Sequence, residues 1–428
     1  MLKFLILTLL LLPNIYATSL EEVKNELRRI INSLHSTTKA GILIINPLTQ
    51  DTIYQLNPAV SMIPASNTKL FTTASALNLL GGGYAISTKI FSSDLNIKDG
   101  VVNGNLYIKG YGNPNFSTRD LELMTSQLKG KNIKLITGDI IGDDTYFDDI
   151  YTRDDWIKNE KANVKLPPIS ALVIDRNRTF VQSKRGRRVR RYVQYVDDPP
   201  LYAAQLLKEK LEEAGIVVNG VAAKGITPGD LPVLSEKKIL LRDLIALINK
   251  HSDNFYAEVL FKTIGAAASG KQGNSFYSTQ AVLNFIEDNA ILKEGTSVVD
   301  GSGISRFNQI TVGAIAGILE KMYFDLKNYE DFYNSLSIAG IDGTLKGRLT
   351  GTPAENNMRG KTGTLNGVTS LSGYLTSLNG EDIIISIIFE FEKGSWNYYR
   401  SIQDRIAETV ANWDEWQIIA VKELILSL

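Results

Sequence analysis

The stretch that decides the fold is Pro64-Ala65-Ser66-Asn67-Thr68-Lys69-Leu70. Apolar residues follow it at helical spacing, which predicts a helix over Ala65–Leu80 that the run Gly81-Gly82-Gly83 ends. Because residues three apart share a helix face, Ser66 Oγ and Lys69 Nζ can meet. Taken alone this Ser-x-x-Lys spacing is a weak signal, since an N-cap serine and a solvated lysine explain it more simply.

The predicted position of Ser66 suits a nucleophile. It lies in the first turn of the helix, where unpaired backbone N–H groups and the positive helix end favour a developing negative charge. A lysine with its ordinary pKa of about 10.4 is protonated at neutral pH and cannot act as a base. Burial and a neighbouring cation can depress that pKa by roughly three units. Lys361 is the expected second cation, so Lys69 is expected to become neutral enough to accept a proton.

Two further motifs follow in the chain. Ser252-Asp253-Asn254 lies between helical patterns at Ile239–Lys250 and Asn254–Ile264, and Lys361-Thr362-Gly363-Thr364 precedes an apolar hairpin between Gly373 and Phe391. Each is weak by itself, because Ser, Asp and Asn gather in loops anyway. Together the three motifs have the order and the structural context found in β-lactamases and penicillin-binding proteins.

The chain resembles the D-alanyl-D-alanine carboxypeptidase/endopeptidase family, the class C low-molecular-mass penicillin-binding proteins. Besides the three motifs, the resemblance rests on stretches 140–145 (IIGDDT), 168–172 (PISAL) and 300–306 (DGSGISR), and it covers almost the whole mature chain. It implies an α+β fold with a β-lactamase/transpeptidase-like catalytic domain, in which helices flank an antiparallel sheet. A large β-rich domain is expected between the first two motifs, whose serines are 186 positions apart (252 − 66). Class A β-lactamases as a family have no room for it.

The expected organisation is a signal peptide at 1–17, the first part of the catalytic domain at 18–87, the inserted domain at 88–234 and the second part of the catalytic domain at 235–428. Strand-like runs between turn signals continue from about Ser87 to about Tyr146. Other predicted elements are a helix at Leu20–Leu34, a hairpin of Gly41–Asn46 with Thr52–Gln55, a helix near Leu201–Ala214, and an amphipathic helix over Trp396–Leu428. The end of that last helix, Trp413–Leu428, is expected to pack on the catalytic sheet, and a membrane-facing foot is the alternative.

The resemblance implies roles for the motif residues. Ser66 would be the nucleophile and Lys69 its base, although the resemblance leaves open which group deprotonates the serine. Ser252 would relay a proton to the leaving amine, and Asn254 would hold both the substrate amide and Lys69.

The third motif would bind the substrate's end. Lys361 and Thr362 would hold the terminal carboxylate of the peptide, and Gly363 and Thr364 of the same motif would belong to the substrate-binding residues. The backbone N–H groups of Ser66 and Thr364 would form the oxyanion hole.

Two residues outside the motifs also match the family. Asp144, from the inserted domain, and Arg306 would recognise the side chain of the peptide stem at the rim of the site. An ion pair between the domains is the structural alternative for them.

Composition excludes several classes of protein. Lys plus Arg equals Asp plus Glu at 46 each, so no nucleic-acid partner is expected. Without any cysteine the chain has no thiol nucleophile and no Cys-based zinc site. Only His35 and His251 could serve a Ser-His-Asp triad or a His-based metal site, so neither a metal nor a cofactor is expected. His251, next to Ser252, is expected to be a boundary residue rather than a base.

The first residues are typical of an export signal. Lys3 provides the positive region, Phe4–Leu12 the apolar region and Ile15-Tyr16-Ala17 a cleavage site. An uncleaved membrane anchor is the alternative, but the apolar run is shorter than the about 20 residues that span a bilayer. We expect a periplasmic protein.

A basic run stands where the family usually has a third small domain. The region between Asp175 and Pro199 is short, so that domain is expected to be reduced to a hairpin. Lys184–Arg191 carries six positive charges in eight residues. A solvated hairpin is the simpler explanation, and peripheral contact with anionic wall polymer or membrane lipid is the functional one.

The predicted function is that of a serine-type D-Ala-D-Ala carboxypeptidase, endopeptidase or both. Its partners would be peptidoglycan stem peptides, with β-lactam antibiotics as covalent inhibitors of Ser66. One alternative is a β-lactamase or esterase on the same scaffold, although the chain has no recognisable motif for the general base that deacylation requires. Another is a penicillin-binding wall scaffold or sensor whose catalysis has lapsed.

Overall fold

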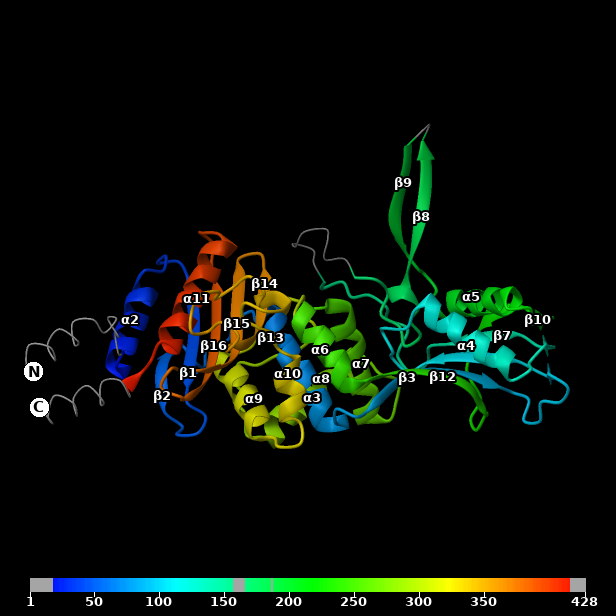
Figure 1. Ribbon diagram of the computed structural model, residues 1–428, viewed down its shortest axis with the longest axis horizontal. Coiled ribbons are helices and arrows are strands. Elements are labelled where there is room, and N and C mark those ends of the chain that lie inside the picture. The colour runs from blue at the N-terminus through cyan, green and yellow to red at the C-terminus, as the bar shows by residue number, and fades with distance from the viewer. Residues whose placement is uncertain (1–17, 157–165, 186–187, 416–428) are drawn as a thin grey trace, which may run out of the picture.

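The computed structural model describes residues 18–156, 166–185 and 188–415 (Figure 1). Two bodies lie side by side along the long axis of the molecule, and a hairpin projects from the second body. The first body contains both ends of the described chain. The second is made from the segment between the first and second motifs.

The first body is built on a six-stranded antiparallel sheet with the strand order β13-β14-β15-β16-β1-β2. Its strands are β1 (Lys39–Ile45), β2 (Thr52–Leu56), β13 (Ser337–Ile338), β14 (Arg359–Leu365), β15 (Val368–Thr376) and β16 (Asp382–Glu390). β1 pairs with β16 in the register Ile42↔Ile387, so segments from both ends of the chain share one sheet. β13 pairs only with Arg359 and Gly360 of β14, and beyond them the outer edge of β14 pairs with no other strand of the described chain.

Helices cover both faces of this sheet, and β16 shows how the sequence provides for two cores (Figure 1). Ile384 and Ile388 belong to the core shared with α3, while Ile385 and Ile387 belong to the core under α11. Because successive strand side chains point to opposite faces, a strand covered on both must be apolar almost throughout. The helices of this body are α2 (Leu20–Asn32), α3 (Thr68–Leu80), α6 (Leu241–His251), α7 (Asn254–Ser269), α8 (Ser275–Asp288), α9 (Val312–Phe324), α10 (Tyr329–Ser335) and α11 (Trp396–Ala411), with 3₁₀ turns at Ala65–Asn67 and Gly343–Leu345.

The second body has a five-stranded sheet of order β11-β7-β5-β3-β12 and a three-stranded sheet of order β10-β6-β4. Its elements are β3 (Ala85–Ser92), β4 (Val101–Val102), β5 (Leu106–Gly110), α4 (Thr118–Gly130), β6 (Leu135–Ile136), β7 (Ile140–Asp143), a 3₁₀ turn (Asp175–Asn177), α5 (Pro199–Glu213), β10 (Val217–Val218), β11 (Ala222–Lys224) and β12 (Val233–Leu240). β3 pairs with β12 in the register Ala85↔Leu240, so the chain leaves and rejoins the first body at one place. The predicted boundary positions, 88 and 234, fall inside these two strands.

The predicted hairpin in place of a third domain is confirmed. β8 (Arg178–Arg185) pairs with β9 (Arg188–Tyr195) and rises from the body of the insertion (Figure 1). Phe180, Tyr192 and Val193 are exposed on it. Most side chains of the basic run lie outside the described residues, and Arg191 at its end is exposed.

Most of the other predicted elements are confirmed within a few residues. They are α2, the β1–β2 hairpin, the helix after Ser66, α5, α6, α7 and the β15–β16 hairpin. The fold class is confirmed too, because the sheet is antiparallel, is flanked by helices and is interrupted by a large insertion between the first two motifs.

Two predictions about helices are wrong. The stretch Ser87–Tyr146 is not made of strands alone, since α4 lies within it; Ser117 caps α4 through a capping box with Asp120. The helix predicted over Trp396–Leu428 ends at Ala411, because Trp413 leaves it to form a bridge with Thr18. The remainder of that prediction, residues 416–428, lies outside the described residues.

Candidate active site

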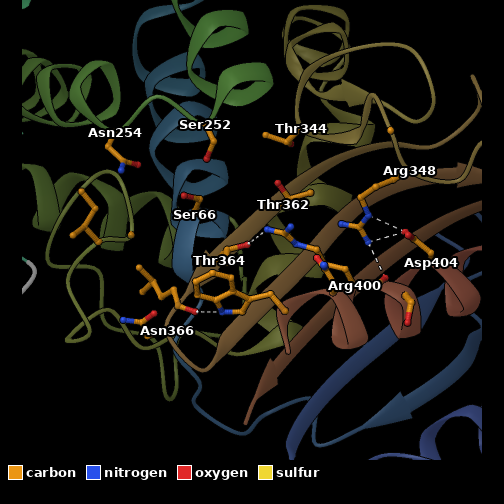
Figure 2. Close-up of a pocket in the computed structure, with 17 residues that line it drawn as sticks. Ser66, Ser252, Asn254, Thr344, Arg348, Thr362, Thr364, Asn366, Arg400 and Asp404 are labelled. Carbon is orange, nitrogen blue, oxygen red and sulfur yellow. Dashed lines mark hydrogen bonds and ion pairs between the residues drawn. The ribbon is translucent and has the colours of Figure 1, made fainter. Parts of the chain in front are cut away.

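The three motifs meet at one cleft of the first body (Figure 2). Ser66 comes from the 3₁₀ turn before α3, Ser252 from the end of α6, Asn254 from the start of α7, and Thr362 and Thr364 from β14. All five line a cavity of about 870 Å³. The motifs are therefore far apart in the sequence and adjacent in space, as predicted.

In two of the three motifs, a residue with a strained backbone conformation positions the motif at the cleft. Ala65, which precedes the nucleophile, has φ 49°, and Ser252 has φ 54°. Residues other than glycine rarely adopt this left-handed conformation, at a cost of about 1–3 kcal/mol each, and they keep it only where the surroundings fix it. Ala65 is fully buried, and Lys361 Nζ donates a hydrogen bond to Ser252 Oγ.

Lys69 is positioned to exchange a proton with Ser66. Its Nζ lies 2.9 Å from Ser66 Oγ, 2.6 Å from Asn254 Oδ1 and 2.6 Å from the Ser302 carbonyl oxygen. The last two atoms can only accept hydrogen bonds. A neutral amine therefore donates both of its protons to them and keeps its lone pair for the Ser66 hydroxyl.

Burial lowers the pKa of Lys69 from its ordinary 10.5 to about 8, while the carboxylates of Asp300, Glu258 and Asp253 oppose that shift. With that pKa, about a tenth of the side chain is neutral at pH 7. Burial, one of the two predicted causes, is the largest contribution to the lowered pKa of Lys69. The other predicted cause, the positive charge of Lys361, acts through the mutual repulsion of the two lysines.

Lys361 is the second buried cation of the site. It has no exposed surface, and its Nζ donates to Ser252 Oγ at 2.9 Å and to the Thr362 carbonyl oxygen at 2.7 Å. Burial, and after it the positive charge of Lys69, hold the pKa of Lys361 well below its usual range. Protonation of the two lysines is therefore coupled. Lys361 is not among the described residues that line the cavity, whereas Ser252, which it contacts, is.

The loop that follows Val299 holds Lys69 from the other side. The buried Asp300 accepts at Oδ1 from Gly303 N, at 2.7 Å, and thereby fixes the loop that presents the Ser302 carbonyl. Gly303 has φ 82°, and a Cβ there would lie 1.9 Å from the Ala65 carbonyl oxygen. Only glycine allows this loop to pack against the turn that precedes the nucleophile.

Glu258 supports the same loop and was not predicted. Its Oε1 accepts from Ser302 N at 2.8 Å, so both backbone groups of Ser302 are held, one by Glu258 and one by Lys69. Burial, with Asp300 nearby, raises the pKa of Glu258 to about 8. Its position four residues after Asn254 gives it the same helix face, but sequence alone favours a solvated carboxylate there.

Gly363 allows β14 to approach the nucleophile. A Cβ at this position would lie 2.2 Å from Ser370 Oγ and 2.9 Å from Ser66 N. The backbone of the third motif therefore lies directly against the turn that contains Ser66.

Asp144 and Arg306 lie away from the described lining of the cavity. Asp144 is mostly buried, its Oδ2 accepts from Tyr151 OH at 2.8 Å, and burial raises its pKa. Arg306 Nη2 donates to the Asn366 carbonyl oxygen at 2.6 Å, and Asn366 does line the cavity. Arg306 is thus next to the rim, and the substrate role of both residues stays a prediction.

The insertion is tied to the second motif by Arg176. Its guanidinium forms a bidentate ion pair with Asp253, at 2.6 and 3.0 Å, and lies 4.8 Å from the ring centre of Tyr256. Asp253 also caps α7 by accepting from Tyr256 N at 3.0 Å. The carboxylate between Ser252 and Asn254 is therefore fixed from two sides.

One wall of the cleft was missed altogether. Trp396, Arg400 and Asp404 of α11 line the cavity together with Arg348 (Figure 2). The spacing of Arg400 and Asp404 shows only that they share a helix face. Nothing local in the sequence says that this face meets β14.

Comparison with known proteins shows which family the chain resembles. A sequence model of the D-Ala-D-Ala carboxypeptidase 3 (S13) family matches residues 23–190 and 185–412. The D-alanyl-D-alanine carboxypeptidase of Actinomadura sp. (strain R39) is 27% identical over 443 residues, covering 87% of this chain and 81% of the relative. The D-alanyl-D-alanine carboxypeptidase DacB of Haemophilus influenzae is 24% identical over 414 residues, covering 83% and 86%.

Solved structures share the fold. The crystal structure of penicillin binding protein 4 (dacB) from Haemophilus influenzae superposes with a TM-score of 0.78 at 23% identity, over 91% of this chain and 99% of that one. The Bd3459 peptidoglycan endopeptidase of Bdellovibrio bacteriovorus superposes with a TM-score of 0.55 at 15% identity, over 86% and 92%. Because the family model spans nearly all of the described chain, this protein belongs to the D-Ala-D-Ala carboxypeptidase 3 (S13) family.

Proposed function

We propose that this protein hydrolyses the peptide bond that follows D-alanine in peptidoglycan stem peptides, as a D-Ala-D-Ala carboxypeptidase, an endopeptidase or both, through an acyl-enzyme on Ser66. The observation that carries the proposal is the contact of Lys69 Nζ with Ser66 Oγ at 2.9 Å, at the wall of an open cleft. Family membership supports the substrate class.

In the acylation step the Ser66 hydroxyl gives its proton to the neutral amine of Lys69, and Oγ attacks the D-alanyl carbonyl carbon. Lys69 can take that proton without rearrangement, because its other two hydrogen-bond positions already face Asn254 Oδ1 and the Ser302 carbonyl. The negative charge on the carbonyl oxygen would be held by the N–H groups of Ser66 and Thr364. The close approach of Gly363 to Ser66 N supports that arrangement.

Collapse of the tetrahedral intermediate breaks the carbon–nitrogen bond. The leaving amine takes a proton through Ser252 Oγ, which lies 2.9 Å from Lys361 Nζ and can be resupplied from it. Water then attacks the carbonyl carbon of the Ser66 ester and gives its proton through Ser252 Oγ to Lys361 Nζ. The carbon–Oγ bond breaks, Oγ takes back its proton from Lys69, and the shortened peptide leaves. Asn254 would orient the substrate amide, and Thr362, with Lys361 behind it, would bind the end of the peptide.

Recognition of the peptide stem is proposed for Asp144 and Arg306. The contact of Arg306 with Asn366 supports this for Arg306, since Asn366 belongs to the cavity wall. For Asp144 the support is the family resemblance.

Incubation with a fluorescent penicillin followed by mass spectrometry tests the mechanism. We expect one stable adduct on Ser66 of the wild type and none on Ser66→Ala. Absence of an adduct from the wild type would remove the acyl-enzyme, and rapid turnover of nitrocefin without an adduct would indicate a β-lactamase instead. Digestion of purified muropeptides then separates release of terminal D-alanine from cleavage of cross-links.

We also propose export to the periplasm and attachment by the β8–β9 hairpin. Residues 1–17, which carry the predicted signal, lie outside the described residues. No helix within the described ranges has the length and apolar character needed to cross a membrane. The projection of the hairpin and its exposed Phe180 and Tyr192 support contact with an anionic wall polymer or lipid surface.

A further inference from the structure

The cleft continues past Thr364 along α11, where the three motifs provide no residue. Of the described residues that line the cavity, Arg348 and Arg400 are cationic and Asp404 alone is anionic (Figure 2). This part of the cleft therefore has one more positive than negative side chain. Such an imbalance beside a substrate cleft favours an anionic group of the substrate.

Asp404 forms its ion pair with Arg348, through Oδ1. Arg348 Nε lies 2.9 Å and its Nη2 2.7 Å from Asp404 Oδ1, and the same Nη2 donates to the Arg400 carbonyl oxygen at 3.2 Å. Arg348 is thus neutralised by its neighbour and holds the backbone of α11 in place. The unbalanced charge is that of Arg400.

Arg400 directs its guanidinium at the third motif. Its Nη2 donates to Thr364 Oγ1 at 3.1 Å, and among the described residues no ion pair to a carboxylate is found for it. Burial, and after it the positive charge of Arg348, lower the pKa of Arg400, while the Asp404 carboxylate opposes that shift. A guanidinium has five N–H donors, so several remain for a ligand.

The other cation near Thr362 and Thr364 is less suited to this task. Lys361 is completely buried, and its Nζ contacts Ser252 Oγ and the Thr362 carbonyl oxygen. Arg400 is only partly buried and lines the cavity. A substrate carboxylate that reaches Thr364 Oγ1 comes within reach of Arg400 without moving any buried group.

We propose that Arg400 binds the C-terminal carboxylate of the substrate together with Thr364, an inference that rests on the proposed acyl-enzyme function. Because Thr364 Oγ1 accepts a hydrogen bond from Arg400, its own proton is left to donate to the carboxylate. The planar guanidinium meets a carboxylate with two parallel hydrogen bonds, which an ammonium cannot do. In this arrangement Lys361 donates to Ser252 Oγ and does not bind the carboxylate.

The test compares acylation rates for two β-lactams that differ only in this charge, benzylpenicillin and its methyl ester. The variants are Arg400→Gln, Arg400→Lys and, as a matched control on the same helix, Arg405→Gln. Arg405 pairs with Glu26 at 3.6 Å and lies outside the described lining of the cavity. Thermal unfolding by circular dichroism verifies that each variant is folded.

For Arg400→Gln we expect acylation by benzylpenicillin to slow by about 10- to 100-fold and acylation by the ester to change by less than about threefold. Arg400→Lys should recover part of the loss, and Arg405→Gln should match the wild type with both compounds. If Arg400→Gln slowed acylation by both compounds equally, Arg400 would only shape the cleft. If it slowed neither, Arg400 would not contact the carboxylate. Either result overturns the inference. A wild type that neither compound acylates would instead overturn the proposed function, and the inference with it.

Discussion

The protonation state of Lys69 controls the activation of Ser66, since only the neutral amine has a lone pair for the hydroxyl proton. Burial lowers the pKa of Lys69 to about 8. The neutral fraction therefore rises tenfold per pH unit well below that value and levels off above it. We expect the second-order rate constant for acylation by benzylpenicillin to follow the same curve, with an apparent pKa of about 8, in stopped-flow measurements from about pH 6 to about pH 10.

Lys69→Arg serves as the control for this pH profile. Arginine keeps its proton throughout that range, so the variant should lose acylation by about 10³-fold or more and show no rise with pH. A wild-type profile that is flat across the range would show that another group deprotonates Ser66.

The Ser66–Lys69 contact could be predicted from the sequence because both residues belong to one helical turn. The third partner of Lys69, the Ser302 carbonyl, could not, since it depends on a loop that Asp300 folds and Glu258 supports. The three motifs were predicted to meet, and residues of all three line one cavity. That burial is the largest cause of the lowered pKa of Lys69 depends on the surroundings of the side chain, which the sequence does not give.

Among elements, the packing of β14 on the turn before α3 is set by Gly363. Gly363→Ala would place a Cβ 2.9 Å from Ser66 N and 2.2 Å from Ser370 Oγ, so the strand must move away from the nucleophile. We expect a loss of about 1–3 kcal/mol in the free energy of unfolding and at least a 100-fold slower acylation. Chemical denaturation and the acylation assay measure the two effects.

Gly347→Ala is the matched control for that substitution. Gly347 also lines the cavity, but a Cβ there meets no atom within 4 Å. It should change stability by less than about 0.5 kcal/mol. If Gly363→Ala behaved like Gly347→Ala, close approach of β14 would not be needed for acylation.

The ion pair between Arg176 and Asp253 couples the insertion to the start of α7. Asp253→Asn keeps a side chain that can cap the helix but loses the bidentate pair. We expect a loss of about 1–2 kcal/mol in stability and slower acylation, because Ser252 and Asn254 flank the changed residue. A double-mutant cycle with Arg176→Ala measures the coupling energy.

Lys293→Gln provides the comparison, because its pair with Glu287 is largely exposed and should be worth less than about 0.5 kcal/mol. A coupling energy between Arg176 and Asp253 no larger than that would show that the insertion does not stabilise the second motif.

The predicted helices were wrong where the local sequence pattern was compatible with more than one structure. α4 lies among short strands and turn signals, although Ser117, Asp120 and the buried Leu121, Met124 and Leu128 have helical spacing. In the C-terminal segment the amphipathic pattern continues past Ala411, but pairing of Trp413 with Thr18 overrides it. Such a contact joins the two ends of the chain and leaves no local sign.

At the scale of the whole molecule, the pairing of β3 with β12 brings both connections of the insertion to one place. The insertion can therefore extend sideways from the catalytic body, and the hairpin projects from it (Figure 1). None of the described residues of the hairpin lines the cavity. The chain has 46 basic and 46 acidic residues, so its net charge gives no long-range attraction to an anionic surface. Any such attraction must come from a local excess, and the run Lys184–Arg191 is the obvious source.

Replacing Arg187, Arg188, Arg190 and Arg191 by glutamate reverses that local excess. We expect the wild type to bind phosphatidylglycerol-containing vesicles or purified sacculi in low salt, and to lose most of that binding above about 0.3 M salt, where charges are screened within several ångströms. The variant should not bind at low salt. Cosedimentation with vesicles and with sacculi, measured separately, distinguishes binding to lipid from binding to wall polymer.

The variant should still be acylated by penicillin at the wild-type rate, since the hairpin is separate from the cleft. Binding by the variant equal to that of the wild type, or wild-type binding that salt leaves unchanged, would contradict an electrostatic role for the hairpin.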